Sequence, residues 1–207
     1  MIAVIDYGLG NLKAVTNMFR RIGIETCLTA EREQIEQADK LVLPGVGAFD
    51  HGIQQLRTHK LIDLLRQEVL ERNKPILGIC LGAQLLTRKS EEGTEEGLGF
   101  LRAECVKFRF EGEKGQLPVP HMGWSPLSVM NPGVLFANME PPLRYYFAHS
   151  YWLKAEDETT VEAFAEYGAA FPAVIVQGRI IAAQFHPEKS HRYGMAFLKN
   201  FAERFGS

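Results

Sequence analysis

The chain has 207 residues, of which 46% are hydrophobic and 23% are charged, so a large core is available and the composition excludes a disordered polypeptide. The net charge is −2 at pH 7 without a basic block, which argues against nucleic acid as a partner. Only four apolar residues follow Met1, and no apolar run approaches the roughly 18 residues of a membrane span. We therefore expect neither a signal peptide nor a membrane protein.

The first half of the chain alternates short apolar runs with amphipathic runs. In residues 11–22 the apolar side chains recur at helical spacing, and Gly23 follows where a helix end favours glycine. Uninterrupted apolar runs are typical of parallel strands covered on both faces. The expected strands are 2–5, 24–28, 40–43 and 75–79, and the expected helices are 11–22, 31–38, 61–70 and one that opens at 81–86.

The second half predicts mostly strands. They are expected over 105–110, over 145–153 and, as a pair that turns at 177–178, within 171–185, with a loop at 111–116. Ser190 is a candidate N-cap for a last helix over 191–205, whose phenylalanines lie four residues apart and would face the sheet. We therefore expect an α/β fold, in a single domain over residues 1–207. Its central sheet is mostly parallel, with helices on both faces and an antiparallel extension in the C-terminal half.

Cys80 lies between two glycines where a predicted strand runs into a predicted helix. In such a tight turn the middle residue is presented above the carboxyl edge of the sheet, and Gly78 and Gly82 remove side chains that would collide there. The helix N-terminus favours the thiolate, which is the nucleophile. Cys80 is thus a candidate nucleophile, although a small buried core residue explains the pentapeptide alone equally well.

Two further segments contain candidate partners for Cys80. His186 follows an apolar strand, and Glu188, two residues on, can orient its imidazole, so the two fit a base and its orienter. The run 43–49 (LPGVGAF) also follows a parallel strand, and Gly45 and Gly47 let its backbone approach a ligand or reorient a peptide. Each segment alone is also compatible with an ordinary surface turn.

These motifs together resemble the class I, or triad, glutamine amidotransferases, through PGVGAF, GICLGAQLL and QFHPE in that order. DYGLGN near the start, SEEG, PHMGW and HPEKS further resemble the glutaminase subunits of imidazole glycerol phosphate synthase in histidine biosynthesis. One departure is Ala83, where the family pattern leads us to expect Met. It raises a question about packing beside the nucleophile, and not about the triad.

The resemblance implies the roles of particular residues. Cys80 attacks the carboxamide of L-glutamine, His186 transfers protons, and Glu188 orients His186. The backbone N–H groups of Val46 and Leu81 hold the oxyanion. The positions that correspond to glutamine binding are Gly45, Gly47, Gln84, His149, Ser150 and Tyr151.

The resemblance also implies a partner. Ammonia passes to a separate (β/α)₈ cyclase subunit, with which the chain forms a heterodimer that makes imidazole glycerol phosphate and an aminoimidazole carboxamide ribonucleotide. The residues expected to face this cyclase are Asn11, His121, Met122, Trp124 and Lys189. Exposed Met and Trp are enriched in interface cores, although a Trp is often simply buried.

Cofactor and metal motifs are absent from the sequence. Lys13 occupies the third glycine position of a dinucleotide fingerprint that begins at Gly8, and no phosphate-binding GK[ST] loop follows. Cys27, Cys80 and Cys105 are odd in number and widely spaced, so we expect no disulfide framework, no metal and a reducing cytoplasmic location. The alternatives are another triad amidotransferase, a free-standing glutaminase and a silent interaction module.

Overall fold

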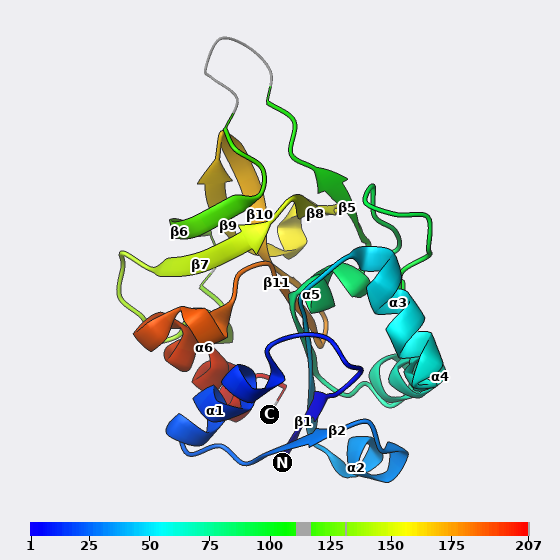
Figure 1. Ribbon diagram of the computed structural model, residues 1–207. Coiled ribbons are helices and arrows are strands. Elements are labelled where there is room, and N and C mark those ends of the chain that lie inside the picture. The colour runs from blue at the N-terminus through cyan, green and yellow to red at the C-terminus, as the bar shows by residue number, and fades with distance from the viewer. Residues whose placement is uncertain (111–116, 131, 207) are drawn as a thin grey trace.

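The computed structural model describes residues 1–110, 117–130 and 132–206, so the loop expected at 111–116 lies outside the described residues. Its centre is a nine-stranded sheet (Figure 1) in the order β2-β1-β3-β4-β11-β10-β9-β6-β7. The first five strands pair in parallel and the rest pair antiparallel. The expected α/β fold with an antiparallel extension in the C-terminal half is therefore confirmed.

The bounds of the elements follow the alternation of the sequence in the first half. The strands of the large sheet are β1 (Ile2–Ile5), β2 (Thr26–Thr29), β3 (Lys40–Gly45), β4 (Ile76–Cys80), β6 (His121–Val129), β7 (Arg144–His149), β9 (Val161–Tyr167), β10 (Ala169–Gln177) and β11 (Ile180–Ala183). A separate antiparallel pair consists of β5 (Ala103–Lys107) and β8 (Tyr151–Ala155). The helices are α1 (Leu12–Arg21), α2 (Arg32–Gln37), α3 (Phe49–Thr58), α4 (Leu61–Arg66), α5 (Leu81–Leu85) and α6 (His191–Arg204), and a π-helical segment, Gln67–Glu71, continues α4.

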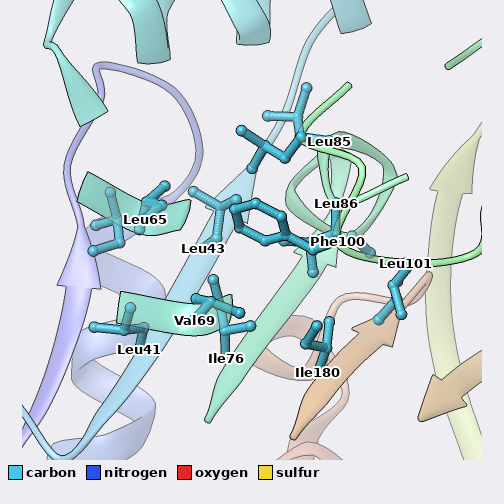
Figure 2. Close-up of a cluster of buried hydrophobic side chains, with 14 of the residues drawn as sticks. Leu41, Leu43, Leu65, Val69, Ile76, Leu85, Leu86, Phe100, Leu101 and Ile180 are labelled. Atoms are coloured by element: carbon cyan, nitrogen blue, oxygen red, sulfur yellow. The ribbon is translucent and has the colours of Figure 1, made fainter. Parts of the chain in front are cut away.

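Buried side chains cover both faces of the sheet. On β1, Ile2 and Val4 point into a cluster with α1 and α6, whereas Ala3 and Ile5 point into a cluster with α3, α4 and α5. Figure 1 shows these helix groups on opposite sides of the strands. Figure 2 shows the second cluster, in which Leu43 of β3 and Ile76 of β4 lie beside Phe100. The apolar runs of the first half are thus strands with two buried faces, as the sequence predicted.

Four parts of the chain differ from the sequence prediction. The run 145–153 is not one strand, because it bends at Ser150: β7 pairs with β6 in the large sheet, whereas β8 pairs with β5. Strands β6 and β9 were not predicted, and β6 contains Gly123 and Pro126, residue types that are depleted in strands. Helix α3 was also missed. Its Gly52 lowers helix propensity, but a Cβ there would lie 2.9 Å from Leu85 of α5, so close helix packing requires the glycine.

The last helix begins as expected, but its N-cap works differently. Ser190 occupies the N-cap position of α6 without a side-chain capping bond. Its hydroxyl instead donates to the carbonyl of His186 at 2.6 Å and accepts from the backbone N–H of Tyr146 at 3.0 Å. The serine therefore ties the start of α6 to the HPE segment and to β7. Among the described helices, none is both long and apolar enough to cross a bilayer.

Candidate active site

The motifs from distant parts of the sequence meet at one edge of the sheet. Strands β3, β4 and β11 are parallel neighbours, with Gly45 opposite Cys80 and Ala183 opposite Ile79. Because parallel strands end at the same edge, the PGVG loop after β3, Cys80 at the end of β4 and the HPE segment after β11 lie together. The expectation that the loop and the cysteine share an edge is confirmed.

Cys80 sits at a strained turn between β4 and α5. Its φ is +53°, a region that a non-glycine residue rarely adopts, and such strain is concentrated at functional sites. A Cβ on Gly82 would lie 1.7 Å from the carbonyl oxygen of Leu43, and a Cβ on Gly78 would lie 2.6 Å from the Cα of Ala83. Both glycines are therefore required by backbone contacts. Although Cys80 is largely buried, it lines a pocket, which a plain core residue does not explain.

The end of β3, where the PGVG segment begins, packs against the start of α5. A Cβ on Gly45 would lie 2.9 Å from the backbone nitrogen of Gly82 and 2.4 Å from the hydroxyl of Tyr7. That hydroxyl donates to the carbonyl of Pro44 at 2.8 Å, and Tyr7 is fully buried. Burial and the charge of Cys80 raise the pKa of Tyr7, so the phenol stays protonated as a donor. Tyr7 thus fixes the root of this loop, a role that the sequence did not reveal.

His186 is held against Glu188 and Cys80. Its Nδ1 lies 2.8 Å from Oε1 of Glu188, and both side chains are 2% exposed. Burial by itself lowers the pKa of His186, but the hydrogen bond and charge of Cys80, followed by those of Glu188, outweigh it and raise the pKa to about 10. Since Glu188 engages Nδ1, Nε2 is the ring nitrogen left for Cys80. The i, i+2 spacing of His186 and Glu188 therefore brings the carboxylate to the imidazole, the geometry that a base and its orienter require.

The pocket has a volume of about 250 Å³ and opens above Cys80. The lining residues that the sequence indicated are Val46, Gly47, Cys80, Leu81, Gln84, His149, Ser150 and Tyr151. The sequence did not assign a pocket role to four others, which are Glu92, Pro120, Met122 and Ala148. Glu92 lies inside the SEEG motif and Pro120 starts PHMGW, so the motifs contained the signal. Gly45 is the one predicted substrate-binding residue that lies beneath the pocket wall.

Two polar side chains of the pocket are tied to its framework. Gln84 Nε2 donates to the carbonyl of Tyr151 at 2.8 Å, which links α5 to the start of β8. Glu92 Oε2 accepts the backbone N–H of Phe49 at 2.9 Å and so satisfies the N-terminus of α3. The pocket therefore presents an amide, a carboxylate and backbone groups around a thiol, which suits a small zwitterionic substrate.

The residues expected at a partner surface divide into two groups. Asn11, Lys189, Met122 and Trp124 are exposed, the last two by 64% and 38%. His121, in contrast, is only 3% exposed, because alternate residues of β6 point to opposite faces and His121 points inward. The expectation that its side chain faces a partner does not match this structure.

The remaining cysteines and Ala83 are structural. Cys105 is buried beside Thr87, its Sγ 3.5 Å from the hydroxyl oxygen, and burial raises its pKa to about 12. Cys27 is partly buried on β2. Ala83 is fully buried against Gly78 and does not line the pocket. Within the described residues, no three His, Cys, Asp or Glu side chains are placed to hold a metal ion.

Comparison with known proteins agrees with this geometry. The model of the family "Glutamine amidotransferase class-I" matches residues 3–205. The chain is 43% identical over 203 residues to "Imidazole glycerol phosphate synthase subunit HisH 2" of Pseudomonas aeruginosa, which covers 98% of this chain and 99% of that relative. It is 42% identical over 205 residues to the HisH subunit of Bacillus subtilis, covering 98% of this chain and 96% of the relative.

Solved structures show the same fold. A crystal structure of a glutamine amidotransferase superposes with a TM-score of 0.73 at 23% identity, covering 97% of this chain and 99% of the other. PurLQS of Thermotoga maritima superposes with a TM-score of 0.72 at 18% identity, covering 97% and 96%. The chain therefore belongs to the class I glutamine amidotransferases and, among them, to the family of HisH subunits of imidazole glycerol phosphate synthase.

Proposed function

We propose that residues 1–207 act as one amidotransferase domain, the glutaminase subunit that releases ammonia from L-glutamine for a separate cyclase. The observation that carries the proposal is the strained Cys80, which lines the pocket and interacts with the buried His186–Glu188 pair. The names of the full-length relatives support the same activity. A nucleophilic cysteine must stay reduced, so we place the enzyme in the cytoplasm.

In the first step the Cys80 thiolate bonds to the carboxamide carbon of glutamine. The carbonyl oxygen becomes an oxyanion, which the backbone N–H of Leu81 and one from the loop at Val46 stabilise. His186 donates its proton to the amide nitrogen, the C–N bond breaks and ammonia leaves. The raised pKa of His186 means that its ring is protonated before this step and ready to donate. The product is a γ-glutamyl thioester on Cys80.

In the second step water hydrolyses the thioester. His186 takes a proton from the water at Nε2, the oxygen bonds to the thioester carbon, and the C–S bond breaks to give glutamate and the Cys80 thiolate. Once Cys80 is acylated, its charge no longer raises the pKa of His186, so the imidazole becomes a better base. Glu188 keeps the ring in the same tautomer through both steps.

The pocket walls fit the two ends of glutamine. The carboxamide end lies over Cys80, and the α-amino and α-carboxylate groups lie among Gln84, Glu92 and the backbone of residues 149–151. The Glu92 carboxylate favours the ammonium, and backbone N–H groups at the Ser150 bend favour the carboxylate. These contacts bind the ground state and the transition state of glutamine equally, because the bond that breaks lies at the carboxamide end.

The cyclase would cover the exposed face of β6 together with the neighbouring residues of β7 and the start of α6. Met122 is 64% exposed and also lines the pocket, so the pocket wall continues into this face. Trp124 stacks on His191 with ring centroids 5.4 Å apart, and the Lys189 ammonium lies 5.4 Å from the centroid of Tyr146. Exposed apolar and cationic groups of this kind fit a permanent interface with the cyclase. Ammonia that crosses such an interface does not enter bulk water.

The test is glutamate release from L-glutamine by the chain alone, and with a histidine-pathway cyclase barrel and its nucleotide ligand. We expect release chiefly in the complex, increasing with nucleotide, because Val46 and Gly47 belong to a loop that a partner can reorient. Strong release without the barrel would indicate a free-standing glutaminase. No release from a formed complex would refute the proposed function.

The matched control is the Cys80→Ala complex. It should lose glutamine-dependent product formation but retain synthesis of imidazole glycerol phosphate from added ammonia. Equal loss of both activities would show that Cys80 maintains the structure or the interface, and not the chemistry.

A further inference from the structure

A buried chain of hydrogen bonds runs from β6 to the substrate pocket. The Ser125 hydroxyl oxygen lies 3.0 Å from Nε2 of His121, and Nδ1 of His121 lies 3.3 Å from Nε2 of His149. Nδ1 of His149 lies 2.8 Å from the carbonyl oxygen of Tyr151. These four groups, the imidazole chain, therefore connect the inner face of β6 to the backbone directly after the Ser150 bend.

The chain has one consistent direction. The Tyr151 carbonyl can only accept, so Nδ1 of His149 carries a proton. Burial lowers the pKa of His149 to about 3 and that of His121 to about 4, so both rings are neutral at neutral pH. Nε2 of His149 then accepts from Nδ1–H of His121, and Nε2 of His121 accepts from the Ser125 hydroxyl. Both rings must therefore be Nδ1–H tautomers.

Packing holds His121 in this orientation. Its ring lies between Tyr167, with centroids 4.1 Å apart and planes at 19°, and Phe147, at 5.1 Å and 19°. His121 and His149 are also direct cross-strand neighbours in β6 and β7. Between His121 and Ser125, Gly123 has a φ of +141°, which a side chain would strain. A ring fixed on both faces is suited to orient its partner and not to move.

The end of the chain is shared with the pocket. The Tyr151 carbonyl accepts from His149 and also from Gln84 Nε2, which lines the pocket. The bend at Ser150 is the place where the run leaves the large sheet for the β5–β8 pair, so strand pairing alone does not fix it. The imidazole chain therefore holds the Tyr151 carbonyl, which is the acceptor at this bend, in one position.

We propose that His121 is a positioning residue for glutamine: through His149 it holds the Tyr151 carbonyl, Gln84 and the substrate-binding backbone at Ser150 in place. This role rests on the proposed glutaminase function. It replaces partner contact as the reason for a histidine at this position, since the neighbouring Met122 faces outward from the same strand and His121 does not.

The test compares His121→Phe with His121→Asn in the complex with the cyclase. His121→Phe keeps a ring between Phe147 and Tyr167 but removes the donor, and we expect the KM for glutamine to rise about tenfold with a smaller change in kcat. His121→Asn keeps an N–H near the position of Nδ1 and should restore KM to within about threefold of the parent. His51→Phe, on the exposed side of α3, is the matched control and should change neither parameter.

Two kinds of result would overturn the proposal, one kinetic and one spectroscopic. One is an unchanged KM in folded His121→Phe, or an equal KM for the Phe and Asn variants. The other comes from the parent chain alone, which covers the case in which a variant does not fold. Nitrogen-15 spectra of the imidazoles at pH 7 must show His121 and His149 as Nδ1–H tautomers. An Nε2–H or doubly protonated ring would contradict the proposed hydrogen bonds of the imidazole chain. A parent complex without glutaminase activity would refute the proposed function, whereas these spectra would still decide the hydrogen bonds.

Discussion

Gly82→Ala tests the construction of the active site most directly. The added Cβ would lie 1.7 Å from the carbonyl oxygen of Leu43, whereas such contacts are essentially never below 3.0 Å, so α5 and β3 must separate by more than about 1 Å. Overpacking of this kind costs about 1–3 kcal/mol, partly offset by the better helix propensity of alanine. For a chain of this size, a net loss of about 1–2 kcal/mol lowers Tm by roughly 2–8 °C.

The effect on activity should be larger than the effect on stability. Helix α5 holds Cys80 and Leu81 at its start, and the PGVG loop directly follows Leu43. Any separation therefore moves apart the backbone N–H groups of Leu81 and Val46, which we propose hold the oxyanion. A displacement of about 1 Å can cost about 10²-fold in rate. We therefore expect kcat/KM for glutamine to fall about 100-fold at a temperature where the variant is folded, as circular dichroism would verify.

A matched control separates strain from geometry. Gly23 has a φ of +77° with no atom within 4 Å of an added Cβ, so Gly23→Ala strains the backbone by about 1–2 kcal/mol, far from the pocket. It should lower Tm by a similar amount and leave kcat/KM within about twofold. If Gly82→Ala retained parental activity, the close approach of α5 and β3 would not be what shapes the site.

Three other changes have defined outcomes. Tyr7→Phe removes the donor to the buried Pro44 carbonyl, which should cost about 1–3 kcal/mol in urea unfolding and lower kcat, and an unchanged kcat would exclude a role for Tyr7 in the loop. Because the folded state lowers the pKa of His121 to about 4 and of His149 to about 3, the unfolded chain binds more protons below pH 6.5. The two rings should therefore lower the unfolding free energy by up to about 2.7 kcal/mol per pH unit as pH drops toward 5, partly offset by the raised pKa values of Glu162 and His186, and an unfolding free energy that does not fall over this range would contradict neutral rings. Glu188→Gln should lower kcat on the order of 10²-fold or more and lower the pKa of the catalytic imidazole, as NMR titration can measure, and a parental kcat would show that the carboxylate is dispensable.

The sequence alone determined the parallel half of the fold and the chemical core of the site. Continuous apolar runs predicted β1, β3 and β4, because a parallel strand buried on both faces is apolar throughout, whereas β11 was expected in the antiparallel extension and in fact pairs in parallel with β4. Glycine spacing around Cys80 predicted a tight turn, since only glycine tolerates backbone contacts such as Gly82 against Leu43. These signals are local in the sequence, so they can be recognised without knowing which segments pack against them.

The antiparallel half depended on tertiary structure. Nothing in the run 145–153 marks Ser150 as a bend, because both flanking segments favour strands and only their partners, β6 and β5, differ. The motif PHMGW led us to expect that His121 faces a partner, whereas its side chain is buried. Its burial follows from the phase of β6 in the sheet, a one-residue choice that pairing with β7 decides. Local patterns thus identified the candidate nucleophile and base, whereas strand pairing between distant segments decided the far wall of the pocket and the buried hydrogen bonds behind it.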